Sequence, residues 1–235
     1  MKTILQNIHK DLKAASDKKT KESGKTFFKE EIKSHGVKIP QVVKIGRENY
    51  SKIKDKSKKD IFFICEELFK TGFIEEAIIA CNYSYNINKQ FEPKDFKIFE
   101  KWMEKYVTNW AVCDTFCNHT MGIFLDYFPE FVENIKKWTK SKNRWVRRAS
   151  AVSFIVPATR GKFLHDVFDI ANSLITDPDD LVQKGYGWAL KVAANKHQKE
   201  VYNYVMEHKN RMPRTALRYA IEKMPPDLKI KAMEK

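Results

Sequence analysis

Trp110 and Asp114 lie four residues apart in the segment Asn-Trp-Ala-Val-Cys-Asp. In a helix this spacing places an indole and a carboxylate on the same face, one turn apart. Trp188 follows Lys184 at the same interval further along the chain. A carboxylate stabilises positive charge that develops in a transition state, and an aromatic ring attracts a cation. The spacing is compatible with such a reaction, or with a surface aspartate paired to a cation beside a tryptophan of the core.

A weak internal repeat surrounds these residues. Val112, Val146 and Val182 begin matching six-residue segments, at intervals of 34 and 36 residues. We expect an earlier copy to begin at Ile74 and a later one at Met212. A repeat of this length is typical of a helical pair that buries its apolar face only by stacking on its neighbours.

The third position of each copy is charged. If the copies superimpose, these side chains line one surface of successive helices, with two carboxylates and three cations in a row. The alternative is that third positions are simply exposed to solvent. In chain order they hold Glu76, Asp114, Arg148, Lys184 and Arg214.

Helices must position these residues. Only eight glycines and eight prolines punctuate the chain, and amphipathic segments of about 12 to 18 residues run between them. Hairpin dipeptides and sustained apolar/polar alternation are missing, so no strands are expected. Several of the segments begin at proline, which suits a first helical turn. The expected helices begin near Thr3, Thr26, Pro40, Lys59, Ile74, Pro93, Asn109, Pro129, Asn143, Lys162, Pro178, Lys199, Pro213 and Pro226.

These patterns predict an all-α fold. We expect a curved α-solenoid of HEAT-like antiparallel helix pairs, formed as a single domain over residues 1–235 and monomeric. Its concave face should be basic, because 44 lysines and arginines against 30 acidic residues leave a net charge of +14. Trp102, Trp138 and Trp145 are assigned to packing.

The charge predicts a polyanionic partner. Nucleic acid is the first candidate and a membrane surface the second. No window offers 18 or more apolar residues, and the charged N-terminal stretch lacks the apolar core of a signal peptide. We therefore expect a cytoplasmic protein without a membrane anchor.

The cysteines and histidines form no recognisable ligand set. Cys113 and Cys117 have helical spacing, but neither His119 nor another pair completes a zinc motif, so we expect reduced, packed thiols and no metal. His35 precedes Gly36 and is expected to end a helix before a glycine cap. No glycine-rich phosphate loop or nucleotide fingerprint is present, so no cofactor is expected.

In its motifs and their order the chain resembles the AlkC/AlkD-type DNA alkylation repair glycosylases, a family built from HEAT-like repeats. The resemblance runs over nearly the whole length. Three stretches carry it, and they are Asn109 to Asp114, Arg144 to Ala149 and Val182 to Trp188. Supporting matches are Phe27 to Phe28, Gly36 to Pro40 and Glu67 to Glu76.

The resemblance implies a DNA glycosylase that removes N3- or N7-alkylated purines from duplex DNA in base excision repair, without flipping the base into a pocket. It implies catalytic roles for Asp114, Trp110 and Trp188, and a DNA contact for Arg148. The resemblance places Phe27 at a position where better-known members of the family carry tyrosine. Phenylalanine keeps the aromatic stacking surface there and lacks the hydroxyl.

The residue types suit that reaction. Alkylation makes the base cationic, so it leaves without a general acid while the sugar gains oxocarbenium character, as in glycoside hydrolysis. Asp114 would stabilise the sugar and position water, while Arg148, Lys184 and Arg214 hold phosphates. The competing hypotheses are a non-catalytic HEAT-like scaffold that binds nucleic acid and a solenoid that binds an acidic protein partner.

Overall fold

The computed structural model describes residues 2–234, which form helices joined by turns and by one longer, mostly extended segment at residues 26–38. No strand occurs among them; an isolated parallel bridge joins Lys33 and Phe73. The predicted all-α class is therefore confirmed. No helix in the described part of the chain is both long and apolar enough to span a bilayer.

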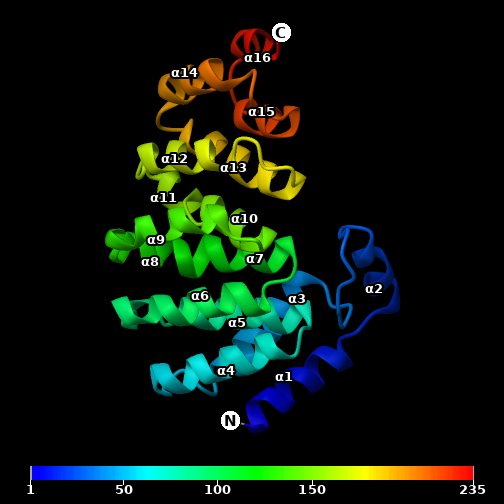
Figure 1. The fold of residues 1–235 in the computed structure, drawn as a ribbon. Helices are drawn as coiled ribbons and strands as arrows, with labels where there is room; N and C mark the ends of the chain where they lie inside the picture. The colour runs from blue at the N-terminus through cyan, green and yellow to red at the C-terminus, as the bar shows by residue number, and fades with distance from the viewer. Residues whose placement is uncertain (1, 235) are drawn as a thin grey trace. The chain divides into compact units, whose positions relative to one another are not determined.

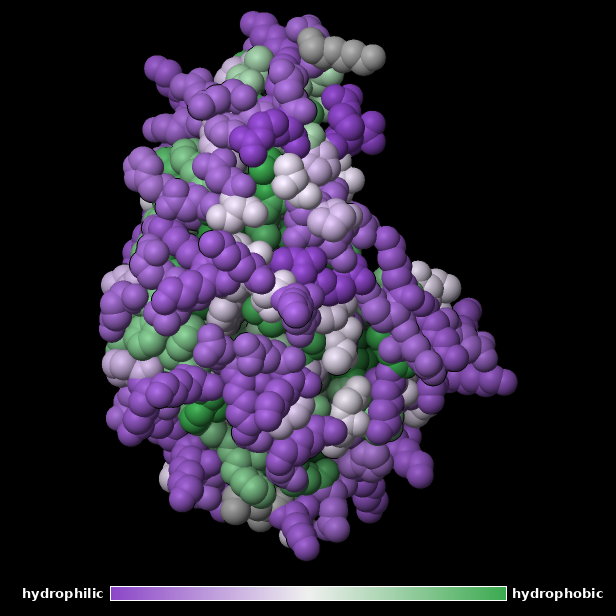
Figure 2. Space-filling model, viewed as in Figure 1, coloured by the Kyte–Doolittle hydropathy of each residue, from purple (hydrophilic) through white to green (hydrophobic). Residues whose placement is uncertain are grey.

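The chain divides into two compact units, residues 1–120 and residues 121–235. Figure 1 shows the helices of each unit packed in successive layers. Solenoid curvature, a single domain and a concave basic face stay predictions. The face of the molecule seen in Figure 2 is covered mostly by hydrophilic side chains, with hydrophobic groups showing in small patches between them.

The first unit is built around α5, which packs against α3, α4 and α7. The N-terminal helix α1 lies across α3, α4 and α5. Two 3₁₀ turns, Asn88–Gln90 and Pro93–Asp95, connect α5 to α6. The helices are α1 (Lys2–Ala14), α2 (Lys18–Lys25), α3 (Ile39–Tyr50), α4 (Lys58–Lys70), α5 (Ile74–Asn86), α6 (Phe96–Tyr106) and α7 (Trp110–Phe116).

The second unit is built around α13, which packs against α10, α11, α12 and α15. A π-helical turn, Cys117–Met121, lies where the units meet in sequence. The helices are α8 (Gly122–Tyr127), α9 (Val132–Lys137), α10 (Arg144–Val152), α11 (Ile155–Thr159), α12 (Leu164–Leu174), α13 (Asp180–Ala193), α14 (Gln198–His208), α15 (Arg214–Ile221) and α16 (Pro226–Met233). Further 3₁₀ turns are Pro129–Phe131 and Trp138–Lys140.

The three helices that carry the repeat copies from Val112, Val146 and Val182 begin in the same way. Asn109, Asn143 and Asp179 are the N-caps of α7, α10 and α13, and each side chain accepts a hydrogen bond from a backbone N–H of the first turn. Each cap lies three residues before the valine that begins the repeat copy, and all three valines, Val112, Val146 and Val182, are buried. An N-cap of this kind satisfies a backbone N–H that has no partner within the helix. The copies that begin at Val112, Val146 and Val182 therefore share the same helix start, whereas α5 and α15 begin without a side-chain cap.

The packing residues behave largely as expected. Trp102, Trp138 and Trp145 are buried. All four cysteines are free thiols and buried, and burial raises the pKa of the Cys65 and Cys81 thiols well above the usual range. These groups are therefore protonated and inert, in agreement with the sequence expectation.

The segment between α2 and α3 differs from the sequence prediction. A helix was expected to begin near Thr26, but α2 ends at Lys25 and Thr26 is its C-cap. The Asp17 side chain caps the start of α2 by accepting from the Thr20 N–H at 2.7 Å. Periodicity could not locate this helix, because α2 buries none of its residues.

His35 does not end a helix, so that expectation is also wrong. It lies in the extended stretch before α3. Gly36 does adopt the left-handed conformation, with φ +83°, but it serves close packing. A Cβ there would lie 2.6 Å from the Cβ of Lys21, so glycine lets this stretch cross α2 closely.

Candidate functional site

Asp114 and Trp110 lie on α7, one turn apart. Both side chains are half-buried, while Val112, Cys113 and Phe116 on the other face enter the core. The Asn109 side chain accepts from the Val112 N–H at 3.0 Å, which fixes where α7 begins. The predicted pairing of an indole and a carboxylate on one helical face is therefore present.

The segment that follows α2 holds Trp110 in place. The indole Nε1 donates to the backbone oxygen of Phe27 at 3.3 Å. The Phe28 ring stacks on the indole, with ring centroids 5.3 Å apart and planes inclined by 19°. Phe27 is 71% exposed. The structure thus brings the Phe27–Phe28 segment onto Trp110, one turn from Asp114. Sequence reasoning assigned a role to Phe27 but none to Phe28.

A cavity of about 360 Å³ lies beneath this aromatic group. Its lining is mainly apolar and comes from the end of α2, the following segment and the starts of α3, α5 and α7. Residues that line it include Phe27, Phe28, Ile32, Ile39, Ile74 and Trp110. The aromatic surface around Trp110 therefore borders a hollow.

Arg148 lies in the interior of the second unit. Its residue is 5% exposed, and its Nη1 donates to the Leu181 carbonyl at the start of α13. A Cβ at Gly185 would lie 3.3 Å from the Arg148 Cγ. The glycine therefore makes room for the arginine between α10 and α13, and Arg148 is not part of an exposed row of cations.

Lys184 and Trp188 occupy α13, one turn apart, and both are half-buried. The Lys184 Nζ lies 3.2 Å from the Asp180 carboxylate. Arg214 is the first residue of α15 and is exposed, and its Nη1 donates to the Met233 carbonyl at 3.3 Å. Arg148 lies on α10, and Lys184 and Trp188 lie on α13, which packs against both α10 and α15, the helix that Arg214 begins.

Glu76 does not project from the surface either. It is 2% exposed, and its Oε1 accepts hydrogen bonds from His9 Nδ1 at 2.9 Å and His35 Nε2 at 2.8 Å. Burial raises the pKa of the Glu76 carboxyl, but the hydrogen bonds from His35 and His9 outweigh it, so the pKa lies below its ordinary value. The expected row of charges along one surface is therefore wrong at Glu76 and Arg148, which are buried.

A family model named DNA alkylation repair enzyme matches residues 8–224. The chain belongs to the DNA alkylation repair enzyme family. Among solved structures, a predicted DNA alkylation repair enzyme from Enterococcus faecalis is similar, with a TM-score of 0.80 and 13% sequence identity. The match covers 90% of this chain and 97% of that chain. At this identity the likeness shows a shared fold. No curated protein matches the chain.

Family membership places the chain among proteins that act on damaged DNA. The match includes both units, and therefore also α7, α10 and α13. The sequence resemblance is thereby confirmed at the level of the family.

Proposed function

We propose that this protein is a DNA glycosylase that hydrolyses the N-glycosidic bond of N3- or N7-alkylated purines in duplex DNA. The observation that carries the proposal is the group on α7, where Asp114 and Trp110 share one face and the Phe27–Phe28 segment packs on the indole. Family membership supplies the DNA alkylation repair context.

The reaction needs little from the protein. An alkylated purine carries positive charge, so it departs without a proton donor, and the sugar becomes oxocarbenium-like as the bond breaks. Asp114 stabilises this sugar electrostatically and orients the attacking water. Trp110 and Trp188 present aromatic faces to the cationic nucleotide, an attraction worth roughly 0.5 to 2 kcal/mol.

DNA binding rests on the net charge of +14 and on cations of the second unit. Arg214 is the most exposed of the three predicted phosphate contacts, and Lys184 is half-buried beside Asp180. Arg148 adds positive charge and also donates a hydrogen bond to the Leu181 carbonyl at the start of α13. Phe27, 71% exposed, adds a stacking surface. In this proposal the base stays in or near the stack while the protein holds the DNA backbone.

The test is Asp114→Asn, which keeps the shape of the side chain and removes its charge. Release of methylated purine from methylated duplex DNA should be abolished, while DNA affinity stays close to that of the wild type. Asp55→Asn is the matched control, because Asp55 is an exposed carboxylate in the turn after α3; it should release base at the wild-type rate.

Wild-type release by Asp114→Asn would contradict the assigned role of the carboxylate. Tight, salt-sensitive binding to duplex DNA with no base released by the wild type would favour the non-catalytic scaffold instead. Competition of DNA binding by acidic peptides would favour a protein partner.

A further inference from the structure

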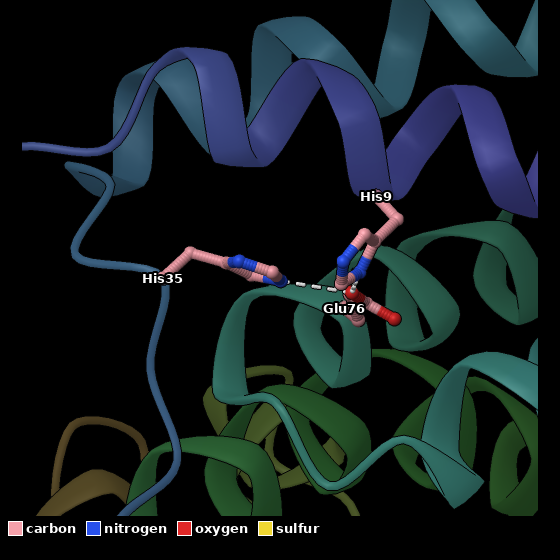
Figure 3. Close-up of side chains that lie close together, drawn as sticks. All are labelled: His9, His35 and Glu76. Atoms are coloured by element: carbon pink, nitrogen blue, oxygen red, sulfur yellow. Dashed lines mark hydrogen bonds and ion pairs between the residues drawn. The ribbon is translucent and has the colours of Figure 1, made fainter.

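His9, His35 and Glu76 converge at one point in the first unit. His9 comes from α1, His35 from the extended stretch before α3, and Glu76 from the first turn of α5. Figure 3 shows both imidazoles pointing toward the carboxylate. One donor atom from each side chain lies within 4.8 Å of the other two. No other group of this kind occurs among residues 2–234.

We propose that these three side chains form a binding site for a divalent transition-metal ion, with Zn²⁺ as the ion that fits best. Two imidazoles and a carboxylate are ligands that Zn²⁺ accepts, and a three-ligand set leaves a fourth tetrahedral position for water. Mg²⁺ and Ca²⁺ fit poorly, because they prefer oxygen ligands.

The distances between the three side chains are slightly shorter than those between the ligands of a bound metal ion. Both imidazole nitrogens contact the same oxygen, Glu76 Oε1, at 2.9 and 2.8 Å. Metal–ligand bonds of 2.0–2.1 Å place tetrahedral ligands about 3.3 Å apart. Each imidazole nitrogen therefore needs to move roughly half an ångström away from Glu76 Oε1, with the metal taking the place of the bridging hydrogens.

The surroundings hold His35 and Glu76 in position. Glu75, the residue before Glu76, is buried, and its carboxylate accepts from the backbone N–H groups of His35, Gly36 and Val37 at 3.0, 2.8 and 3.2 Å. The His35 ring stacks on Phe73, with centroids 3.8 Å apart. Such outer contacts orient metal ligands and raise affinity.

An entry path leads to the site from solvent. A cavity of about 480 Å³ is lined by His9, Thr71 and Glu76, with Lys10 and Lys13 also contributing. His9 is the exposed member, with 49% of its side chain accessible. An ion can therefore arrive through this opening and keep a water molecule on that side.

A bound metal would join three elements of the first unit. It would tie α1 and the 31–38 stretch to α5, in addition to the hydrogen bonds that already do so. Binding to the folded chain alone stabilises it by mass action. The inference does not rest on the proposed glycosylase activity.

The experiment uses the full chain, without an affinity tag, after treatment with a chelator. Zn²⁺ is titrated by calorimetry, Co²⁺ by visible absorption, and Tm is measured with and without Zn²⁺. We expect one equivalent of Zn²⁺ per chain, tetrahedral Co²⁺ bands and a higher Tm, with Mg²⁺ failing to compete.

His9→Ala is the main variant, because His9 is half-exposed and its loss leaves the core intact. It should weaken Zn²⁺ binding about tenfold or more and abolish the rise in Tm. His165→Ala is the matched control at an exposed histidine of α12, and it should bind as the wild type does. Failure of the wild type to bind Zn²⁺, or unchanged affinity in His9→Ala, would overturn the proposal.

Discussion

Gly187→Ala should destabilise the second unit, because α15 approaches α13 too closely to admit a methyl group. A Cβ at Gly187 would lie 2.7 Å from the Tyr219 Cβ and 2.8 Å from the Ala216 carbonyl oxygen. Both atoms are fixed to the α15 backbone, so the two helices must separate by several tenths of an ångström. Overpacking of this kind costs about 1–3 kcal/mol.

Gly185→Ala is the matched control, two residues earlier in the same helix. Its nearest neighbour is the Arg148 Cγ at 3.3 Å, a side-chain atom that needs to shift by only a few tenths of an ångström. Both substitutions gain the same helix propensity, roughly 1 kcal/mol, so this term cancels in the comparison. Gly187→Ala is therefore expected to be less stable than Gly185→Ala by about 1–3 kcal/mol.

The assay is equilibrium urea unfolding followed by far-UV circular dichroism. Base release by Gly187→Ala should also fall, because Trp188 and Lys184 are carried by the displaced helix. Equal unfolding midpoints for the two variants, or a higher midpoint for Gly187→Ala, would refute the packing argument.

Two further predictions concern charge. Burial raises the pKa of Glu66, but hydrogen bonds from Lys101 and Trp102 outweigh it, so the pKa is lowered. Ionised Glu66 therefore contributes to the free energy of unfolding above the ordinary glutamate pKa of about 4.3, and this contribution is lost as pH falls through the pKa of Glu66 in the folded protein. The difference in free energy of unfolding between the wild type and Glu66→Gln, measured in urea, should therefore decrease from pH 7 to pH 3. A difference that stays constant over this range would contradict the stabilising role of ionised Glu66. Arg214→Ala should leave Tm nearly unchanged, because the side chain is exposed, and reduce the salt slope of DNA binding by about one; an unchanged slope would remove Arg214 from the interface.

Arg148→Ala, by contrast, is a poor probe of DNA contact. Its guanidinium is inside the unit and donates to the Leu181 carbonyl. Removing it leaves a void and an unpaired acceptor, so weaker DNA binding would follow from altered packing alone.

The register of the repeats was predictable because its determinants are local. Asn109, Asn143 and Asp179 are short side chains that favour N-caps, and they precede buried valines at a fixed interval. The pairing of Trp110 with Asp114 also needed only helical geometry. Gly185 and Gly187 lie within the stretch Val182 to Trp188 that carries the resemblance, but the close contacts that require glycine there are made by α10 and α15.

The rest depended on contacts between distant segments. Glu76 occupies a repeat position that predicts exposure, but α1 and the stretch around His35 cover it, from 67 and 41 residues away in sequence. Phe28 became part of the site because a segment without periodicity folds back on α7. The helix expected near Thr26 was misplaced for a different reason, because α2 buries none of its residues and so shows no apolar periodicity.

We propose that this member of the DNA alkylation repair enzyme family excises alkylated purines. The most direct measurement incubates the wild-type chain with methylated duplex DNA and separates the freed bases by chromatography. We predict release of N3- or N7-methylated purine, with an abasic site left in the DNA for each base released. Methylated DNA that is bound but returned intact, with no free base and no abasic site, would contradict the account.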